Sequence, residues 1–289
     1  MKRSSFLFRN FFLWFFSWSF LFVLAIYNES EVFKTLLIGV LLTCIAAMAA
    51  FDNMDMNEKK KKAREDIDNY MELIEIISTR YFSIKKICEM CNRETNIDHR
   101  YTRGLRIPEL HVPTMYSDIK FSKYGFIVKG MSKFSFDDDE DIKYALDLMN
   151  YINIESSYRN LISSIALRNQ QHRDIIDRLN DKGEYQGADF FMYSAREYSS
   201  VMSFYEFSSY LKQTERIIID MNYLIEDYKR ITMGLKFCID KLFDNEVAKE
   251  YGGIFEVPLY EDLIEFKYVN LNEQELLKLD YPDFPHNVA

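Results

Sequence analysis

Two cysteines, Cys88 and Cys91, and a downstream histidine, His99, have the types and spacing that come closest to a site for chemistry. Thiolates and imidazoles that converge on one point bind zinc tetrahedrally, and a C-x-x-C pair can also act in redox exchange. Both cysteines, however, lie on the apolar face of a predicted helix, where they would pack as small apolar side chains. We therefore predict no metal and no cofactor, and we keep these three residues as an alternative zinc site.

Few other residues form patterns that could support catalysis or ligand binding. The chain has no glycine-rich phosphate loop, no G-x-S-x-G nucleophile turn and no H-E-x-x-H zinc motif. His172 falls on the apolar face of another predicted helix, so a core position is predicted for it. Arg100, Arg103 and Arg106 form a basic cluster, which is either a solvated loop or a docking patch for a phosphate-bearing ligand or an acidic partner. No residue is predicted to be catalytic.

Two apolar stretches near the N-terminus predict a pair of transmembrane helices, at about 11–27 and 32–51. At about 1.5 Å per residue, each uncharged core extends about 25 Å, and its apolar flanks bring it near the ~30 Å hydrocarbon core of a bilayer. The linker between the stretches is short and polar. A hairpin of two helices satisfies its backbone hydrogen bonds inside each helix, as lipid requires.

Three other interpretations of these stretches stay open. The first stretch could be a cleaved signal peptide, although no small-x-small cleavage site follows it. Cys44 could belong to a lipoprotein signal, although it lies far from the N-terminus and follows Thr43. The pair could also be a buried hairpin of a soluble protein, but the first stretch is too rich in aromatic residues to keep a polar face.

Basic residues flank the predicted hairpin on both sides and are absent from its linker. The positive-inside rule therefore places both chain ends in the cytoplasm, with the hairpin in the inner membrane. The basic run after the second span should contact anionic lipid headgroups; it comprises Lys59, Lys60, Lys61, Lys62 and Arg64.

Small residues recur at four-residue spacing in the second span, at Gly39, Thr43 and Ala47. Such a row lets another helix approach closely. The approaching helix could be the first span of the same chain or the second span of another copy. The second case predicts self-association in the membrane.

Sustained heptad spacing predicts long helices after the spans. Apolar residues recur at alternating steps of three and four in a helix at about 58–91 and again in a helix at about 214–246. Such rows are typical of helices that pack lengthwise on partners. The first row is Ile67, Tyr70, Ile74, Ile77, Tyr81, Ile84, Cys88 and Cys91, and the second is Ile217, Met221, Leu224, Tyr228, Ile231, Leu235, Cys238 and Leu242.

The remaining segments complete a mostly α fold. Further helices are predicted at 139–181, 188–212, 259–266 and 272–279. Glycine and proline interrupt residues 92–136, which predicts a small insertion that is either irregular or a β-hairpin built from 115–121 and 126–136. The predicted domains are a transmembrane hairpin at 1–57, a cytoplasmic helical bundle at 58–253 and a tail of short helices at 254–289.

The charge balance of the chain argues against one class of partner. The net charge is -9, and the first 51 residues hold more basic than acidic side chains, so the cytoplasmic part is more acidic still. Phosphate backbones are bound by clustered Lys and Arg. General nucleic-acid binding is therefore not expected.

In layout, the two apolar stretches followed by a helical cytoplasmic domain resemble the two-transmembrane effector proteins of bacterial anti-phage systems such as retrons. The resemblance is one of architecture and carries no functional residue. It implies a non-enzymatic effector whose soluble bundle binds a cytoplasmic trigger or protein partner and changes how the membrane hairpins pack, ending in growth arrest. The alternatives are a constitutive membrane scaffold and a membrane-bound enzyme with the cysteine site.

Overall fold

The computed structural model describes residues 18–19, 21–23, 26, 31–93, 104, 107–112, 118–134, 139–181, 200–243, 245–250, 252–254 and 257. The chain divides into two compact units, 1–62 and 63–289. The boundary between the units falls inside one helix, α2 (Glu31–Arg93). Each unit is described by itself.

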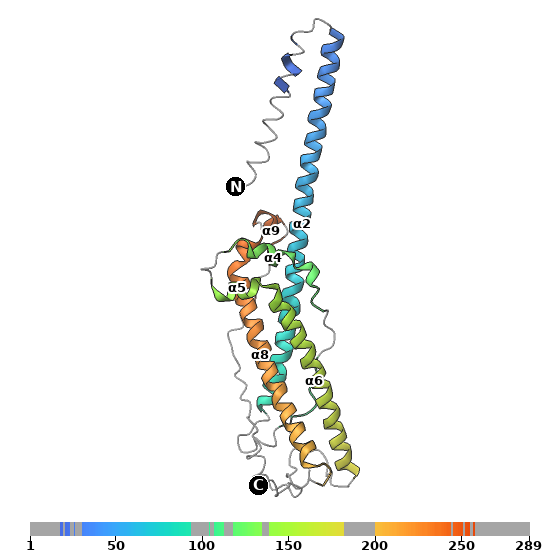
Figure 1. Cartoon of the computed structure of the whole chain (residues 1–289), viewed down its shortest axis with the longest axis vertical. Helices are drawn as coiled ribbons and strands as arrows, with labels where there is room; N and C mark the ends of the chain where they lie inside the picture. Colours follow the sequence, from blue (N-terminus) through green and yellow to red (C-terminus); the bar gives the residue numbers. More distant parts are fainter. Residues whose placement is uncertain are drawn as a thin grey trace. The chain divides into compact units, whose positions relative to one another are not determined.

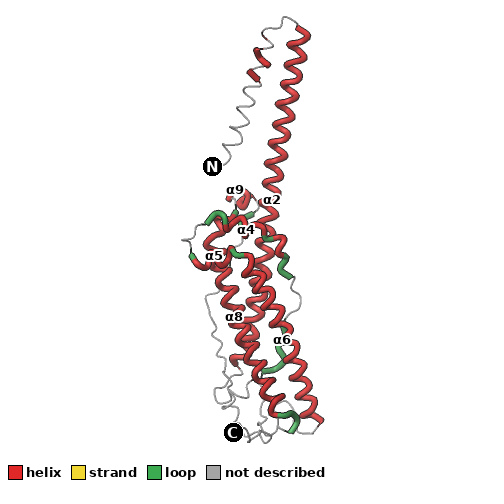
Figure 2. Tube along the Cα trace, viewed as in Figure 1, coloured by secondary structure: helices red, strands yellow, loops and turns green. Residues whose placement is uncertain are grey.

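Within the described part of the second unit, long helices lie side by side as a bundle, with short helices beside them (Figure 1). The last part of α2 packs with α6 (Leu148–Asp181) and α8 (Phe204–Leu242). The short helices are α4 (Gly125–Met131), α5 (Glu140–Leu146) and α9 (Asn245–Glu250), and a 3-10 turn, η2 (Phe121–Lys123), precedes α4. The part of the chain that the structure describes is mostly helical and holds no strand, as Figure 2 shows.

The β-hairpin alternative for the insertion is wrong at its second strand. Residues 121–131 form η2 and α4 instead. Phe126, Ile127 and Gly130 are buried on one side of α4, and Gly130 lies against Leu242 of α8. Burial against the bundle therefore overrides the strand preference of the β-branched residues here. Most of the predicted first strand lies outside the described residues.

The helix predicted at 139–181 is two helices. Asp139 caps the start of α5 by accepting a hydrogen bond from the Asp141 N–H at 2.8 Å. Asp147 then adopts an extended conformation, and its side chain accepts a hydrogen bond from the Met149 N–H at 2.9 Å. This aspartate ends α5 and caps α6, so the two helices take separate directions.

The helix break predicted near 213 is also wrong, because α8 runs through it. The helix starts at a capping box in which Ser203 and Glu206 satisfy each other's backbone N–H groups. Residues 200–202 are turn and bend, and 182–199 lie outside the described residues, as do the helices predicted after 258.

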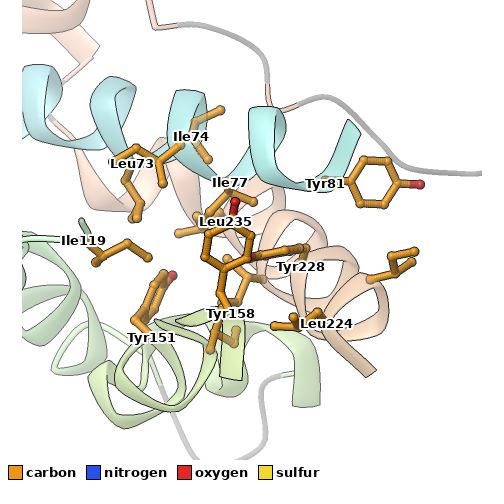
Figure 3. Packing of buried hydrophobic residues seen from close by; sticks show 14 of the residues in the cluster. Leu73, Ile74, Ile77, Tyr81, Ile119, Tyr151, Tyr158, Leu224, Tyr228 and Leu235 are labelled. Carbon is orange, nitrogen blue, oxygen red and sulfur yellow. The ribbon is translucent and has the colours of Figure 1, made fainter. Parts of the chain in front are cut away.

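Both heptad rows are buried in the main core of the bundle. Figure 3 shows Ile77 of α2, Tyr158 of α6 and Tyr228 of α8 converging from the three long helices. A glycine permits the close approach of α5 to α8. A Cβ at Gly234 of α8 would lie 2.6 Å from the Ala145 Cβ of α5, so only glycine fits there.

A polar layer divides the apolar interior of the bundle into two clusters. The larger cluster reaches Ile165 on α6 and Ile217 on α8, and the smaller one begins at Ile175 and Leu211. Between them lie the buried polar side chains of Arg168, Asn169, His172 and Thr214, which we call the polar layer together with Tyr210, a residue of the smaller cluster whose hydroxyl reaches them.

Candidate functional site

The apolar part of α2 in the first unit is exposed. From Ile38 onward, α2 is the one described helix that is long and apolar enough to cross a membrane, and its apolar window has no buried residue within the chain. Ile38, Leu42 and Phe51 are among its exposed large side chains. An uncovered apolar helix of this length is what a lipid environment would accommodate. The first predicted span lies mostly outside the described residues.

The small-residue row on this part of α2 is open to an approaching helix. Among the residues that the structure describes, no atom beyond the local backbone of α2 lies within 4 Å of the position a Cβ would take on Gly39. The Thr43 hydroxyl donates to the Gly39 carbonyl at 2.9 Å, which satisfies the one polar side chain of the row inside its own helix. Ala47 is exposed.

The basic run stands at the end of the first unit and the start of the second. Lys59 is paired with Asp55 in the first unit, and Arg64 lies 3.8 Å from Glu250 in the second. The side chains of Lys61 and Lys62 are exposed, and that of Lys60 is half-buried. The exposed charges keep the run available to anionic surfaces.

The cysteine pair lies in the core. Cys88 and Cys91 are buried, and the Cys88 Sγ lies 3.6 Å from the Met221 Sδ of α8. Burial raises the pKa of the Cys88 thiol, which holds it protonated and unreactive. No group of metal-ligand residues is gathered among the described residues. His99, Arg100, Arg103 and Arg106, which completed the predicted zinc site and docking patch, lie outside them.

An ion pair that was not predicted from the sequence lies inside the bundle. Arg80 of α2 donates to the Glu155 carboxylate of α6 at 2.6 Å, and the exposed fractions of the two side chains are 1% and 6%. Arg159 donates to the other carboxylate oxygen at 2.9 Å. The Arg80 guanidinium also stacks 4.1 Å from the centre of the Tyr158 ring.

Both members of this pair are held in their charged forms. Burial would raise the pKa of Glu155, but the hydrogen bonds from Arg80 and Arg159 bring it below its ordinary value. Burial would lower the pKa of Arg80, but the hydrogen bond to Glu155 raises it. Arg80 shares heptad spacing with Leu73 and Ile87, which are also buried. A charge in an otherwise apolar row was the signal that could have revealed the pair.

The polar layer holds a segment of the chain that we call the strap, Gly104 and residues 107–110. Arg168 donates to the carbonyls of Gly104 at 2.7 Å, Pro108 at 2.6 Å and Ile107. The Tyr210 hydroxyl donates to the Gly104 carbonyl at 3.0 Å. A buried guanidinium is thereby surrounded by carbonyl oxygens.

The strap is also fixed by α6 residues beyond Arg168. Asn169 binds the backbone of Leu110 twice, accepting from its N–H at 3.0 Å and donating to its carbonyl at 2.7 Å. Arg173 pairs with Glu109 at 2.7 Å. Ile107 and Leu110 are buried in the main core.

His172 belongs to the polar layer, where its Nδ1 lies 2.7 Å from the Tyr210 hydroxyl. Burial, with the charges of Arg168 and Arg173, lowers the pKa of His172 to about 4. The imidazole is therefore neutral at physiological pH and serves as a hydrogen-bonding partner in the core.

Comparison with known proteins adds no relative to this picture. No family model, no curated protein and no solved structure matches the chain.

Proposed function

We propose that the protein is a non-enzymatic membrane effector of the bacterial anti-phage type, whose helical bundle binds a cytoplasmic trigger and controls the packing of a two-helix membrane hairpin. The hairpin spans the inner membrane at about 11–27 and 32–51, with both chain ends in the cytoplasm. One observation carries the proposal. A single helix, α2, contains both the exposed apolar segment and the buried row of the bundle core.

The physical argument is that a helix transmits a rotation or shift along its length better than a flexible linker does. Repacking of the bundle around the second half of α2 would change the orientation of its apolar half. The exposed row at Gly39, Thr43 and Ala47 would then pack against spans of other copies, and the assembled hairpins would disturb the bilayer.

Expression of the full chain beside a 52–289 truncation in bacteria tests this proposal, with viability and entry of a membrane-impermeant dye as the measurements. We expect toxicity that requires residues 1–51, because the truncation lacks the apolar half of α2. Harmless expression of both proteins together with every tested trigger would support a constitutive scaffold instead.

Two substitutions distinguish assembly through the small-residue row from a general effect of the span. Gly39→Leu fills the row and should reduce dye entry, because the approaching backbone is pushed away. Ala49→Leu adds nearly as much bulk at an exposed small residue outside the four-residue spacing of the row, and should leave dye entry unchanged. Equal effects of the two changes would contradict assembly through the row.

A further inference from the structure

A charged segment of α2 follows its apolar part, and we call this segment, residues 52–59, the stalk. The stalk lies in the first unit, and all of its side chains are exposed. Its charges gather on one side of the helix. At about 100° per residue, Asp52, Asp55, Glu58 and Lys59 fall within about one third of the helix circumference. Lys59 pairs with Asp55 along this side.

The opposite side of the stalk carries no charge. It presents Asn53 and Asn57, one helical turn apart, with Met54 and Met56 on either flank. The exposed fractions of these methionines are 60% and 45%. Water can be excluded from this side without burying a charge, which is not true of the charged side.

The two asparagines continue a heptad repeat that begins in the apolar part of α2. Alternating steps of four and three lead back from Asn57 to the other residues of this row, and all of them are exposed. In a parallel coiled coil the row would occupy the a and d positions, the two methionines the flanking e and g positions, and the stalk charges the outer b, c and f positions. We call the row the seam: Gly39, Thr43, Ala46, Ala50, Asn53 and Asn57.

We propose that two copies of the chain pair in parallel along the seam, and that their stalks form a short coiled coil outside the lipid. The pair forms before any trigger acts, so repacking of the bundles acts on pairs. This inference rests on the membrane anchoring in the proposed function, and it names a second copy of the chain as the partner of α2.

An identical helix is the partner that this surface fits. Copies anchored in one membrane with the same orientation hold their α2 helices parallel and at the same height, so each Asn53 meets its own counterpart. A carboxamide is both donor and acceptor, so two identical carboxamides can hydrogen-bond to each other. Asparagine at a seam position fixes the register of parallel helices. Like charges of the two stalks also come to the same height, and their outer positions keep them apart.

The part of the seam within the apolar segment suits the same contact. Gly39, Ala46 and Ala50 are small and let two backbones approach closely. The Thr43 hydroxyl already donates to the Gly39 carbonyl at 2.9 Å, so it needs no partner from the second copy. A two-turn stalk is too short to pair by itself in water. Anchoring in one membrane supplies the high effective concentration that the pairing needs.

Disulfide crosslinking of the full chain in bacterial membranes, without a trigger, tests the proposal. The starting variant carries Cys44→Ser, which removes the exposed cysteine and leaves the buried ones. Asn53→Cys places a thiol on the seam, where two parallel helices come within disulfide distance. Asp55→Cys is the matched control, since it is as exposed but lies on the charged side. With a mild oxidant, Asn53→Cys should give about tenfold or more covalent dimer than Asp55→Cys on a non-reducing gel.

A second pair of variants tests the contact between the asparagines. Asn57→Cys should also crosslink. Adding Asn53→Asp brings two carboxylates together across the seam and should reduce that crosslinking several-fold. Adding Asp55→Asn, which changes one charge on the outer side, should leave it unchanged. Equal effects of the two added changes would contradict pairing along the seam.

The crosslinking result is independent of toxicity. Equal dimer from Asn53→Cys and Asp55→Cys would indicate random collision, and no dimer from either would mean that no second copy lies on the seam; both results would overturn the proposal. A harmless chain that crosslinks selectively at Asn53→Cys would keep the pairing and count against the effector. A toxic chain that does not crosslink there would do the reverse.

Discussion

The buried ion pair makes a quantitative prediction about the stability of the bundle. Arg80→Met leaves the Glu155 carboxylate, 6% exposed, without its interhelical partner. Glu155→Leu leaves the Arg80 guanidinium, 1% exposed, without a carboxylate. Removing one member of a buried pair costs about 3–5 kcal/mol, because the remaining charge is desolvated and uncompensated. Each single variant should lose stability by about that amount.

The double variant should be more stable than either single one. Methionine and leucine fill similar volumes, and replacing a whole buried pair by apolar residues is often neutral or stabilising. Two other groups also lose their hydrogen bond to the Glu155 carboxylate in the double variant. Arg159 is 59% exposed and can turn to water, whereas the Ile119 N–H loses its acceptor, at about 1–3 kcal/mol. We therefore expect the double variant to be less stable than the wild type by about 1–3 kcal/mol.

Urea unfolding of the 52–289 truncation at pH 7, followed by circular dichroism, measures these costs. The main core lies wholly within residues 63–289, so the truncation retains it. The costs of the two single changes should fail to add by about 3 kcal/mol or more, since the partners touch. Additive costs would refute the reasoning, because they would mean that the two charges are solvated separately.

The pH dependence of stability tests the same ion pair in a second way. The folded-state pKa of Glu155 lies below its unfolded value, so the pair's contribution is present above the unfolded pKa of about 4.3 and is lost as the pH falls through the folded pKa. The wild type should therefore lose its advantage over the Glu155→Leu variant in strong acid. A stability difference that stays constant below pH 4 would contradict the assignment.

Three further changes test other contacts of the bundle. Gly234→Ala should cost about 1–3 kcal/mol and lower the melting temperature of the truncation, because the methyl group collides with the backbone carbonyl of Asp141. His172→Gln should flatten the pH dependence of stability. The pKa of His172 is about 4 in the folded state and about 6.5 in the unfolded state. His172 therefore lowers wild-type stability as the pH falls from about 6.5 to about 4, by at most about 3 kcal/mol. Lys133→Ala should cost about 0.5–1 kcal/mol in urea unfolding, because Lys133 donates to the Leu242 carbonyl at the end of α8.

Matched controls belong to these three tests. Gly125→Ala, at a glycine with no atom within 4 Å of the added Cβ, should leave the melting temperature nearly unchanged. An NMR titration of His172 should show a neutral imidazole at pH 5. A protonated His172 at that pH would contradict its burial beside Arg168 and Arg173. For Lys133, arginine in place of alanine should keep most of the stability, because it retains the positive charge.

The heptad rows made most of the long-helix architecture predictable. Rows of eight residues extend over several turns, so their period is evident in the sequence, and the same residues are buried in the structure. The short helices were not predictable. α4 and α5 have seven residues each, too few to show a helical period, and packing on α8 decides their conformation. The Ser203 capping box, by contrast, was a readable signal that would have placed the start of α8 correctly.

The polar contacts show where a single sequence stops being informative. The spacing of Arg80 and Arg168 within apolar rows indicates that both are buried, but not what each one meets. Arg80 meets a carboxylate 75 residues away, whereas Arg168 meets backbone carbonyls of a segment about 60 residues away. The two arginines therefore hold different parts of the chain. Arg80 holds α2 and α6 in one register through a carboxylate fixed on α6, whereas Arg168 holds the segment that contains Ile107 and Pro108 against α6.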